Sequence, residues 1–333
     1  MRAVLALALV AVLLAVAPAP ASAAPTGAGL TIAVLDSGID AAHPEVAGRV
    51  TRESFADPTL PITLPIDLPL PQDPDGQGTA VASVAAGATL GVAPKAQLLD
   101  LQVSTSTGLD LVDPATEAAA IDALDALLRE PGRARIVVLG FAQAGVTGEG
   151  GRTLAEQVHG LRAAGVLVVV PTGPAANPLS SSPDAVTVAG REACPGDLGA
   201  AFKPDLVAKS AGVQAATAST DGLSPRTTGS HDGTALAAAQ VAGAAALLWE
   251  TNPDLPVDAV AAYLRDAAKD VAPAGPDKCT GFGELDAAAA VAWAAMWRDP
   301  FASSGKHDAP APGLALLLAA RAVAAWAGRR RHG

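Results

Sequence analysis

Three short segments hold the side chains whose types and spacing could serve a hydrolytic reaction. The first is an apolar run that ends in Asp36-Ser-Gly and is followed by His43-Pro44. The second is Gly76-Gln77-Gly78-Thr79, and the third is Asp232-Gly233-Thr234-Ala235. A common solution to amide hydrolysis combines a serine nucleophile, a histidine base and an aspartate that orients the histidine. We therefore take these segments as the candidate site.

The order and spacing of the segments resemble the catalytic motifs of the subtilisin-like serine proteases, also called subtilases or peptidase family S8. The Asp36 segment is similar to the aspartate motif of that family. The Gln77 segment, closed by Gly91-Val92-Ala93-Pro94, is similar to the histidine motif, and the Ala235 segment to the serine motif. The match runs from about residue 30 to residue 292. The resemblance implies a three-layer α/β fold with a mostly parallel sheet of six or seven strands and helices on both faces.

Most catalytic positions of the family carry other residues in this chain. The aspartate falls on Asp36, the histidine on Gln77, the serine on Ala235 and the oxyanion asparagine on Pro174. A glutamine amide cannot take up and return a proton near neutral pH, and alanine has no nucleophile. Proline offers neither a side-chain amide nor a backbone N–H. The resemblance therefore implies a pseudoprotease, with the alternative of an active serine-type endopeptidase that uses non-standard residues.

Three nearby side chains are the available substitutes for the lost groups: Ser83, His231 and Thr234. We interpret them as ordinary helix or loop residues, because the motif backbone directs only positions 77 and 235 into the site. We also expect Asp36, Gln77 and Ala235 to converge, with Gln77 Nε2 donating a hydrogen bond to the buried Asp36 carboxylate. An inert remnant without a selected function is a third interpretation that the sequence leaves open.

A substrate groove is a second feature that the resemblance implies. Relatives bind peptide as an added strand against a segment that aligns with Gly140, Phe141 and Ala142. Either this edge still takes an extended peptide by main-chain pairing, or Phe141 fills the specificity pocket. The calcium loop of relatives is reduced to Ala88-Thr89-Leu90, so we expect no metal at that site, and we expect no cofactor.

Both ends of the chain carry targeting features. Arg2, an apolar run and Ala21-Ser22-Ala23 predict a signal peptide over residues 1–23, in preference to a permanent membrane helix. The subtilisin-like domain is predicted over 24–298 and a linker over 299–312. Residues 313–333 form an apolar segment with a basic end, which is either a membrane anchor or a surface helix. Arg321, near its middle, makes the free energy of membrane insertion less favourable by about 2.5–3.5 kcal/mol.

This layout also resembles the mycosins, which are membrane-anchored proteases tied to type VII secretion. The resemblance implies a binding or scaffolding role at the cell envelope, with an extended peptide or an envelope or secretion protein as partner. The formal net charge of −11 argues against nucleic-acid partners. Cys194 and Cys279 are the only two cysteines of a chain predicted to leave the cytosol, so a disulfide between them is expected.

The elements that must position these residues follow from apolar runs that alternate with alanine-rich stretches. Strands are predicted at 31–36, 96–103, 134–140, 166–171, 185–189 and 205–208. Helices are predicted at 78–87, 114–129, 152–163, 233–250, 256–268 and 285–297. Strands that alternate with helices indicate βαβ units and a buried parallel sheet.

Overall fold

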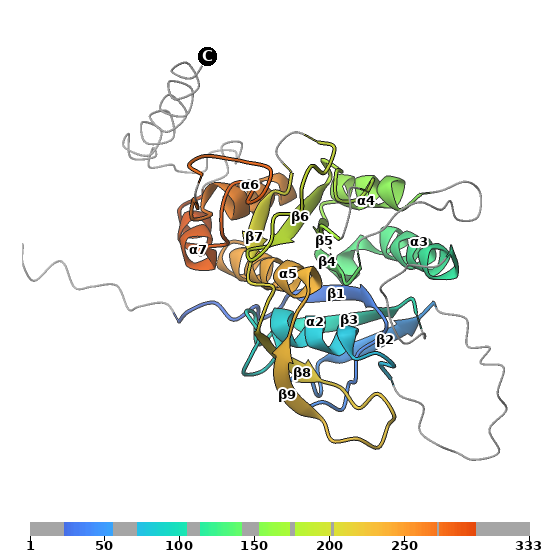
Figure 1. Cartoon of the computed structure of the whole chain (residues 1–333). Helices are drawn as coiled ribbons and strands as arrows, with labels where there is room; N and C mark the ends of the chain where they lie inside the picture. Colours follow the sequence, from blue (N-terminus) through green and yellow to red (C-terminus); the bar gives the residue numbers. More distant parts are fainter. Residues whose placement is uncertain are drawn as a thin grey trace, which may run out of the picture. The chain divides into compact units, whose positions relative to one another are not determined.

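The computed structural model has a seven-stranded parallel sheet in the strand order β2-β3-β1-β4-β5-β6-β7 (Figure 1). The structure describes residues 23–55, 72–104, 114–141, 153–173, 177–200, 203–271 and 273–297. The strands are β1 (Thr31–Asp36), β2 (Val50–Ser54), β3 (Gln97–Gln102), β4 (Ile136–Leu139), β5 (Leu167–Pro171), β6 (Ala185–Gly190) and β7 (Leu206–Ala208). The predicted fold class is thus confirmed.

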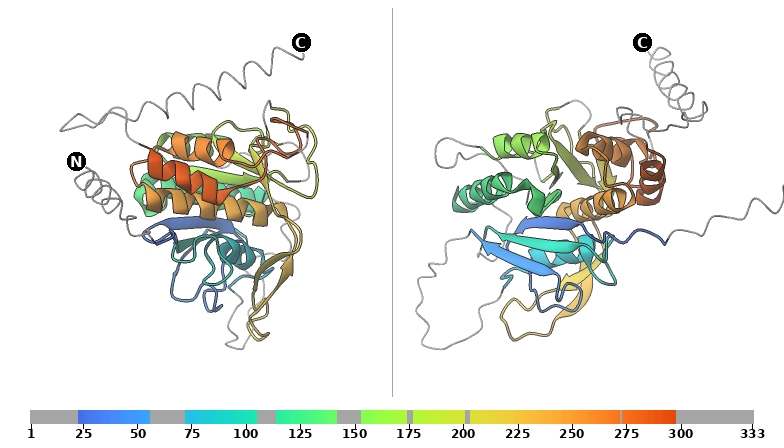
Figure 2. Two further views of the ribbon diagram at one scale, coloured as in Figure 1. Left: turned by 90° about the vertical axis from the view of Figure 1, so that its left-hand side faces the viewer. Right: turned by 180° about the vertical axis from the view of Figure 1, so that it is seen from behind.

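Helices cover both faces of the sheet. They are α2 (Gln77–Ala86), α3 (Pro114–Arg129), α4 (Leu154–Ala163), α5 (Thr234–Thr251), α6 (Val257–Asp266) and α7 (Ala287–Met296), with a short 3₁₀ turn at Pro131–Arg133. Helices α3 and α4 lie on one side, and α5, α6 and α7 on the other (Figures 1 and 2). Along β1, Ile32 and Val34 enter the core beneath α2 and α5, whereas Ala33 and Leu35 enter the core beneath α3 and α4. This alternation is the two-residue period of a strand buried on both faces.

Three strands were missed by the sequence prediction. Strand β2 has the sequence Val-Thr-Arg-Glu-Ser and is partly exposed at the edge of the sheet. Strands β8 (Val213–Thr217) and β9 (Thr227–His231) form a separate antiparallel hairpin that is drawn in yellow in Figure 1. All residues of β9 are at least partly exposed. Strands β2 and β9 carry polar side chains and β8 is short and interrupted by Gln214, so none of them has the continuous apolar run that identified the others.

Close packing of α2 against α5 brings together the two helices that carry positions 77 and 235. Gly243 of α5 lies at the contact, where an added Cβ would come within 2.7 Å of Ala85 O and of Val92 Cβ. Alanine-rich helices allow such an approach because their side chains occupy little volume. In a parallel sheet the carboxyl ends of the strands share one edge, and the site is built along that edge.

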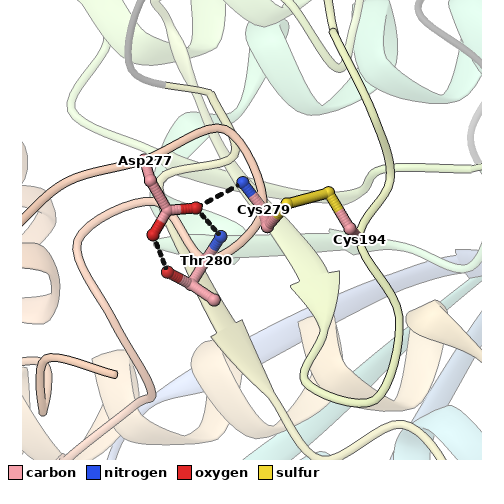
Figure 3. Close-up of a disulfide and its surroundings, with 4 residues drawn as sticks. All are labelled: Cys194, Asp277, Cys279 and Thr280. Carbon is pink, nitrogen blue, oxygen red and sulfur yellow. Dashed lines mark hydrogen bonds between the residues drawn. A yellow bond between two sulfur atoms is a disulfide. The ribbon is translucent and has the colours of Figure 1, made fainter. Parts of the chain in front are cut away.

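The predicted disulfide between Cys194 and Cys279 is confirmed, with a Cα–Cα distance of 4.4 Å (Figure 3). Cys279 lies in a turn organised by Asp277, whose carboxylate accepts hydrogen bonds from Cys279 N, Thr280 N and Thr280 Oγ1. The bridge thereby fastens the segment before α7 to the loop that follows β6.

The ends of the chain are largely outside the described residues. This holds for residues 1–22 of the predicted signal peptide, for the predicted linker and for the apolar C-terminal segment. Among the described residues, no helix combines the length and the apolar character that crossing a membrane requires.

Candidate active site

Asp36 is a fully buried carboxylate at the end of β1. Its Oδ1 accepts hydrogen bonds from Ser37 N at 2.8 Å and from Ser37 Oγ at 3.3 Å. Its Oδ2 is buried and has no hydrogen-bond partner among the residues that the structure describes. Gly140 makes room for this oxygen, because a Cβ at position 140 would lie 1.6 Å from Asp36 Oδ2. The aspartate position of the motif is therefore intact, but one of its two carboxylate oxygens, Oδ2, has no hydrogen-bond donor among the described residues.

Gln77 is the first residue of α2 and faces the same glycine. Its Nε2 donates to the backbone oxygen of Gly140 at 2.5 Å. Our prediction that Gln77 would donate to Asp36 is therefore wrong. The backbone carbonyl that follows β4 is the acceptor, and the amide is held beside Asp36 without a hydrogen bond to it.

Two carboxylates that the sequence analysis did not single out complete the surroundings of Asp36. Asp73 and Asp75 lie in the turn before α2, and Ser37 Oγ is 2.7 Å from Asp73 Oδ1 and 2.6 Å from Asp75 Oδ1. Asp73 Oδ2 also accepts hydrogen bonds from Thr79 N at 2.8 Å and from Thr79 Oγ1 at 2.5 Å. The only sequence indication was their place directly before the Gln77 motif.

The electrostatic surroundings of Asp36 and Asp73 favour the protonated form of these two carboxyls. Burial, together with the charges of Asp73 and Asp75, raises the pKa of Asp36 well above its ordinary value, although the Ser37 hydrogen bonds oppose the shift. Burial likewise raises the pKa of Asp73 to about 6, against the hydrogen bonds from Thr79 and Ser37. A neutral Asp36 cannot provide the negative charge with which a catalytic aspartate stabilises an imidazolium.

Ala235 is the second residue of α5, and its methyl group is buried. The preceding Gly233 has a φ of 150°, a conformation open to glycine. The first turn of α5 lies beside the end of β6, since a Cβ at Gly190 would lie 3.7 Å from Thr234 Cγ2. Position 235 is thus at the carboxyl edge of the sheet, like Asp36 and Gln77, and it carries no reactive atom.

Two of the substitutes considered for the lost groups have structural partners. Ser83 Oγ is buried, donates to Ala80 O at 2.8 Å and accepts from Ala216 N at 2.8 Å, so it connects α2 to β8. His231 Nε2 is 2.9 Å from Thr217 Oγ1 across the β8–β9 hairpin. Neither contact forms a serine–histidine pair.

The segment aligned with the substrate groove is only partly described. Gly140 is buried and its carbonyl already accepts from Gln77. Phe141 is 3% exposed and packs in the apolar core beneath α3 and α4. Ala142 of the groove and Pro174 of the oxyanion position lie outside the described residues. Within the described part of the chain, no group of three or more His, Cys, Asp or Glu side chains has a metal-binding arrangement.

Comparisons with known proteins agree with this architecture. The model of the subtilase family, Peptidase_S8, matches residues 27–283. Subtilisin NAT of Bacillus subtilis subsp. natto is 28% identical over 249 residues, which are 68% of this chain and 57% of that protein. The subtilisin-like protease PopC of Myxococcus xanthus is 43% identical over 74 residues, which are 22% of this chain and 15% of that protein. The chain therefore spans between about one seventh and somewhat over half of these relatives.

Solved structures show the same fold. A protease from Pseudoalteromonas arctica PAMC 21717 superposes with a TM-score of 0.63 at 21% identity, covering 81% of this chain and 91% of that chain. MycP1 with its N-terminal propeptide removed superposes with a TM-score of 0.59 at 20% identity, covering 84% of this chain and 94% of that chain. At these identities the likeness concerns the fold alone.

Proposed function

The chain belongs to the subtilase family of serine-type peptidases, and we propose that this member is a pseudoprotease that binds or scaffolds instead of cleaving. In the family mechanism, position 77 holds the histidine base that moves the proton, and position 235 holds the serine nucleophile. Position 77 carries an amide and position 235 a methyl group. In subtilisin, loss of the nucleophile or of the histidine alone lowers kcat by about 10⁶-fold. A chain without both has no route to the acyl-enzyme.

The observation that carries the proposal is the hydrogen bond from Gln77 Nε2 to Gly140 O. It supports the proposal in two ways. In this contact the Gln77 side chain acts as a donor, and an amide is too weak a base to take up the proton of a nucleophile near neutral pH. The same contact occupies a main-chain acceptor of the segment that aligns with the peptide-binding strand of relatives. An extended peptide would have to displace Gln77 before pairing with Gly140.

Export to the cell envelope is the second part of the proposal. The apolar N-terminal run with Ala21-Ser22-Ala23 supports it, and so does the disulfide, because disulfides persist mainly in oxidising compartments. We assign the apolar segment over 313–328 an anchoring role, with the basic end in the cytoplasm. The mycosin-like layout of the sequence favours a partner in an envelope or secretion complex.

A fluorophosphonate probe tests the proposal, because the probe reacts only with an activated serine. The purified chain without residues 1–23 is incubated with the probe at several pH values and then digested for mass spectrometry, with an active subtilisin as positive control. We expect no adduct. An adduct on any serine or threonine, with Ser83 and Thr234 as the first positions to inspect, would support the alternative of an active endopeptidase.

A further inference from the structure

One hydroxyl group stands between three carboxylates in the candidate site. Ser37 Oγ is 2.7 Å from Asp73 Oδ1, 2.6 Å from Asp75 Oδ1 and 3.3 Å from Asp36 Oδ1. A serine hydroxyl has a single hydrogen, so it can donate to only one of them. The second short contact is a hydrogen bond only if that carboxyl carries its own proton and donates to Ser37. The geometry therefore requires at least one proton on the cluster of Asp36, Asp73 and Asp75, which we call the carboxyl cluster.

Among the residues that the structure describes, no cation balances the carboxyl cluster. Asp36 Oδ2 and Asp75 Oδ2 are buried without a partner among the described residues. The neighbouring arginines are engaged elsewhere: Arg52 pairs with Asp100 at 2.6 Å, and Arg226 pairs with Asp40 at 2.7 Å. The described parts of α2 and β4, which pack against the cluster, contain no charged residue.

Other charged groups of the surrounding elements lie in their own contacts. On the loop between β8 and β9, Asp221 accepts from Leu223 N and Ser224 N. In the hairpin, His231 contacts Thr217, and before β2 His43 contacts Thr227 O. Asp100, beneath the cluster, is itself a buried acid whose pKa is raised to about 6 by burial, against its pairing with Arg52. Protons are thus the counter-charge that the described surroundings leave available.

The carboxyl cluster also holds the beginning of α2 in place. Asp73 Oδ1 accepts from Gly76 N at 3.0 Å, and Asp75 Oδ1 accepts from Gln77 N at 2.8 Å. These bonds cap a helix whose N-cap residue is a glycine without a side chain to do so. They fix the backbone of Gln77, and this position lets its amide reach Gly140.

We propose that the carboxyl cluster is a proton-operated latch that controls whether Gln77 covers Gly140. With a proton shared through Ser37, residues 72–77 stay folded against β1 and the amide stays on the carbonyl. When the cluster loses that proton, adjacent carboxylates repel each other, the turn opens and the Gly140 carbonyl becomes free to pair with an extended strand. The latch rests on the proposed function, in which Gln77 covers a binding segment and is not a catalytic base.

The direction of the pH dependence follows from the raised pKa values of Asp36 and Asp73. A carboxyl with a raised pKa in the folded state stabilises the fold below its unfolded pKa, and this contribution is lost as the pH rises through the folded value. The latch is therefore closed near pH 4 and opens as the pH rises toward about 6. Between pH 4.5 and pH 8, a carboxyl with a pKa of about 3.9 in the open state and about 6 in the closed state shifts the opening equilibrium by about 25-fold, and the raised pKa of Asp36 acts in the same direction.

Hydrogen–deuterium exchange tests the latch without reference to activity. Exchange of peptides covering residues 72–80 is measured at pH 4.5 and pH 8, corrected for the intrinsic rate and compared with α6 (257–266). We expect protection of 72–80 to fall about 10- to 100-fold at pH 8 while α6 stays protected. Asp75→Asn keeps an oxygen for Gln77 N but removes one charge that raises the pKa of Asp36 and Asp73, so the pH response should become smaller. If Asp75→Asn does not fold, Asp36→Asn is the second test, and it should also reduce the pH response of residues 72–80.

Asp258→Asn is the matched control, since that side chain is 82% exposed on α6. It should leave the pH response of 72–80 unchanged. A pH-independent protection of 72–80 in the wild type, or an unchanged response in both cluster variants, would overturn the latch. The fluorophosphonate result is separate: labelling would refute the pseudoprotease, whereas flat exchange without labelling would refute only the latch.

Discussion

Gln77→Leu should destabilise the domain, because it removes the amide that satisfies the Gly140 carbonyl. Leucine has a similar volume but no donor, and Gly140 is buried. The 2.5 Å hydrogen bond is therefore lost and its acceptor is left without a partner. Stranding a buried acceptor costs about 1–3 kcal/mol. For a domain of this size each kcal/mol lowers Tm by about 2–4 °C, so we expect a decrease of about 2–12 °C.

Urea unfolding and thermal scans at pH 5, where the folded carboxyl cluster keeps its proton, are the appropriate assays. Gln214→Leu is the matched control because it makes the same substitution on β8 at an exposed position. The control should shift Tm by much less than the Gln77 variant. Equal shifts in the two variants, or a Gln77→Leu protein as stable as the wild type, would refute the assignment of Gln77 as a structural donor.

Three further changes separate structural roles from catalytic ones. Asp36→Asn should raise the unfolding free energy by about 1–3 kcal/mol at pH 8 and have little effect at pH 5, because it removes a buried charge that exists only at high pH. Urea titrations check this, and an equal gain at both pH values would contradict it. Ala235→Ser alone should hydrolyse no fluorogenic peptide, because Gln77 cannot accept the serine proton; turnover would overturn that assignment. The paired change Cys194→Ser and Cys279→Ser opens a loop of 85 residues and should cost about 2–5 kcal/mol in urea unfolding, whereas an unchanged midpoint would contradict it.

The central sheet was predictable from the sequence because parallel strands are buried on both faces. Strand β5, Leu167–Pro171, has no exposed residue and reads as an unbroken apolar run. Strand β2 contains Arg52 and Glu53, whose side chains pair with Asp100 and Arg133. Such an edge strand depends on its sheet neighbour and on ion pairs, which leave no apolar pattern. The cysteine pairing was predictable because a chain with two cysteines has one possible intramolecular bridge.

Within the candidate site, motif spacing predicted which positions matter but not which atoms meet. Asp36 and Gln77 both border Gly140, yet the side-chain torsions of Gln77 direct its amide to a carbonyl instead of a carboxylate. Asp73 and Asp75 were missed because their contacts with Ser37 join segments 36 and 38 residues apart. A proline-containing turn contains no local pattern that reveals such contacts.

Hydrolysis by the wild-type domain is the most direct test of whether this subtilase has lost its chemistry. The measurement follows cleavage of a mixed fluorogenic peptide library by the purified chain without residues 1–23, beside an Asp36→Ala variant prepared identically. We predict that both proteins stay at the buffer rate from pH 5 to pH 9. Wild-type turnover above that rate, lost in the Asp36→Ala variant, would contradict the account.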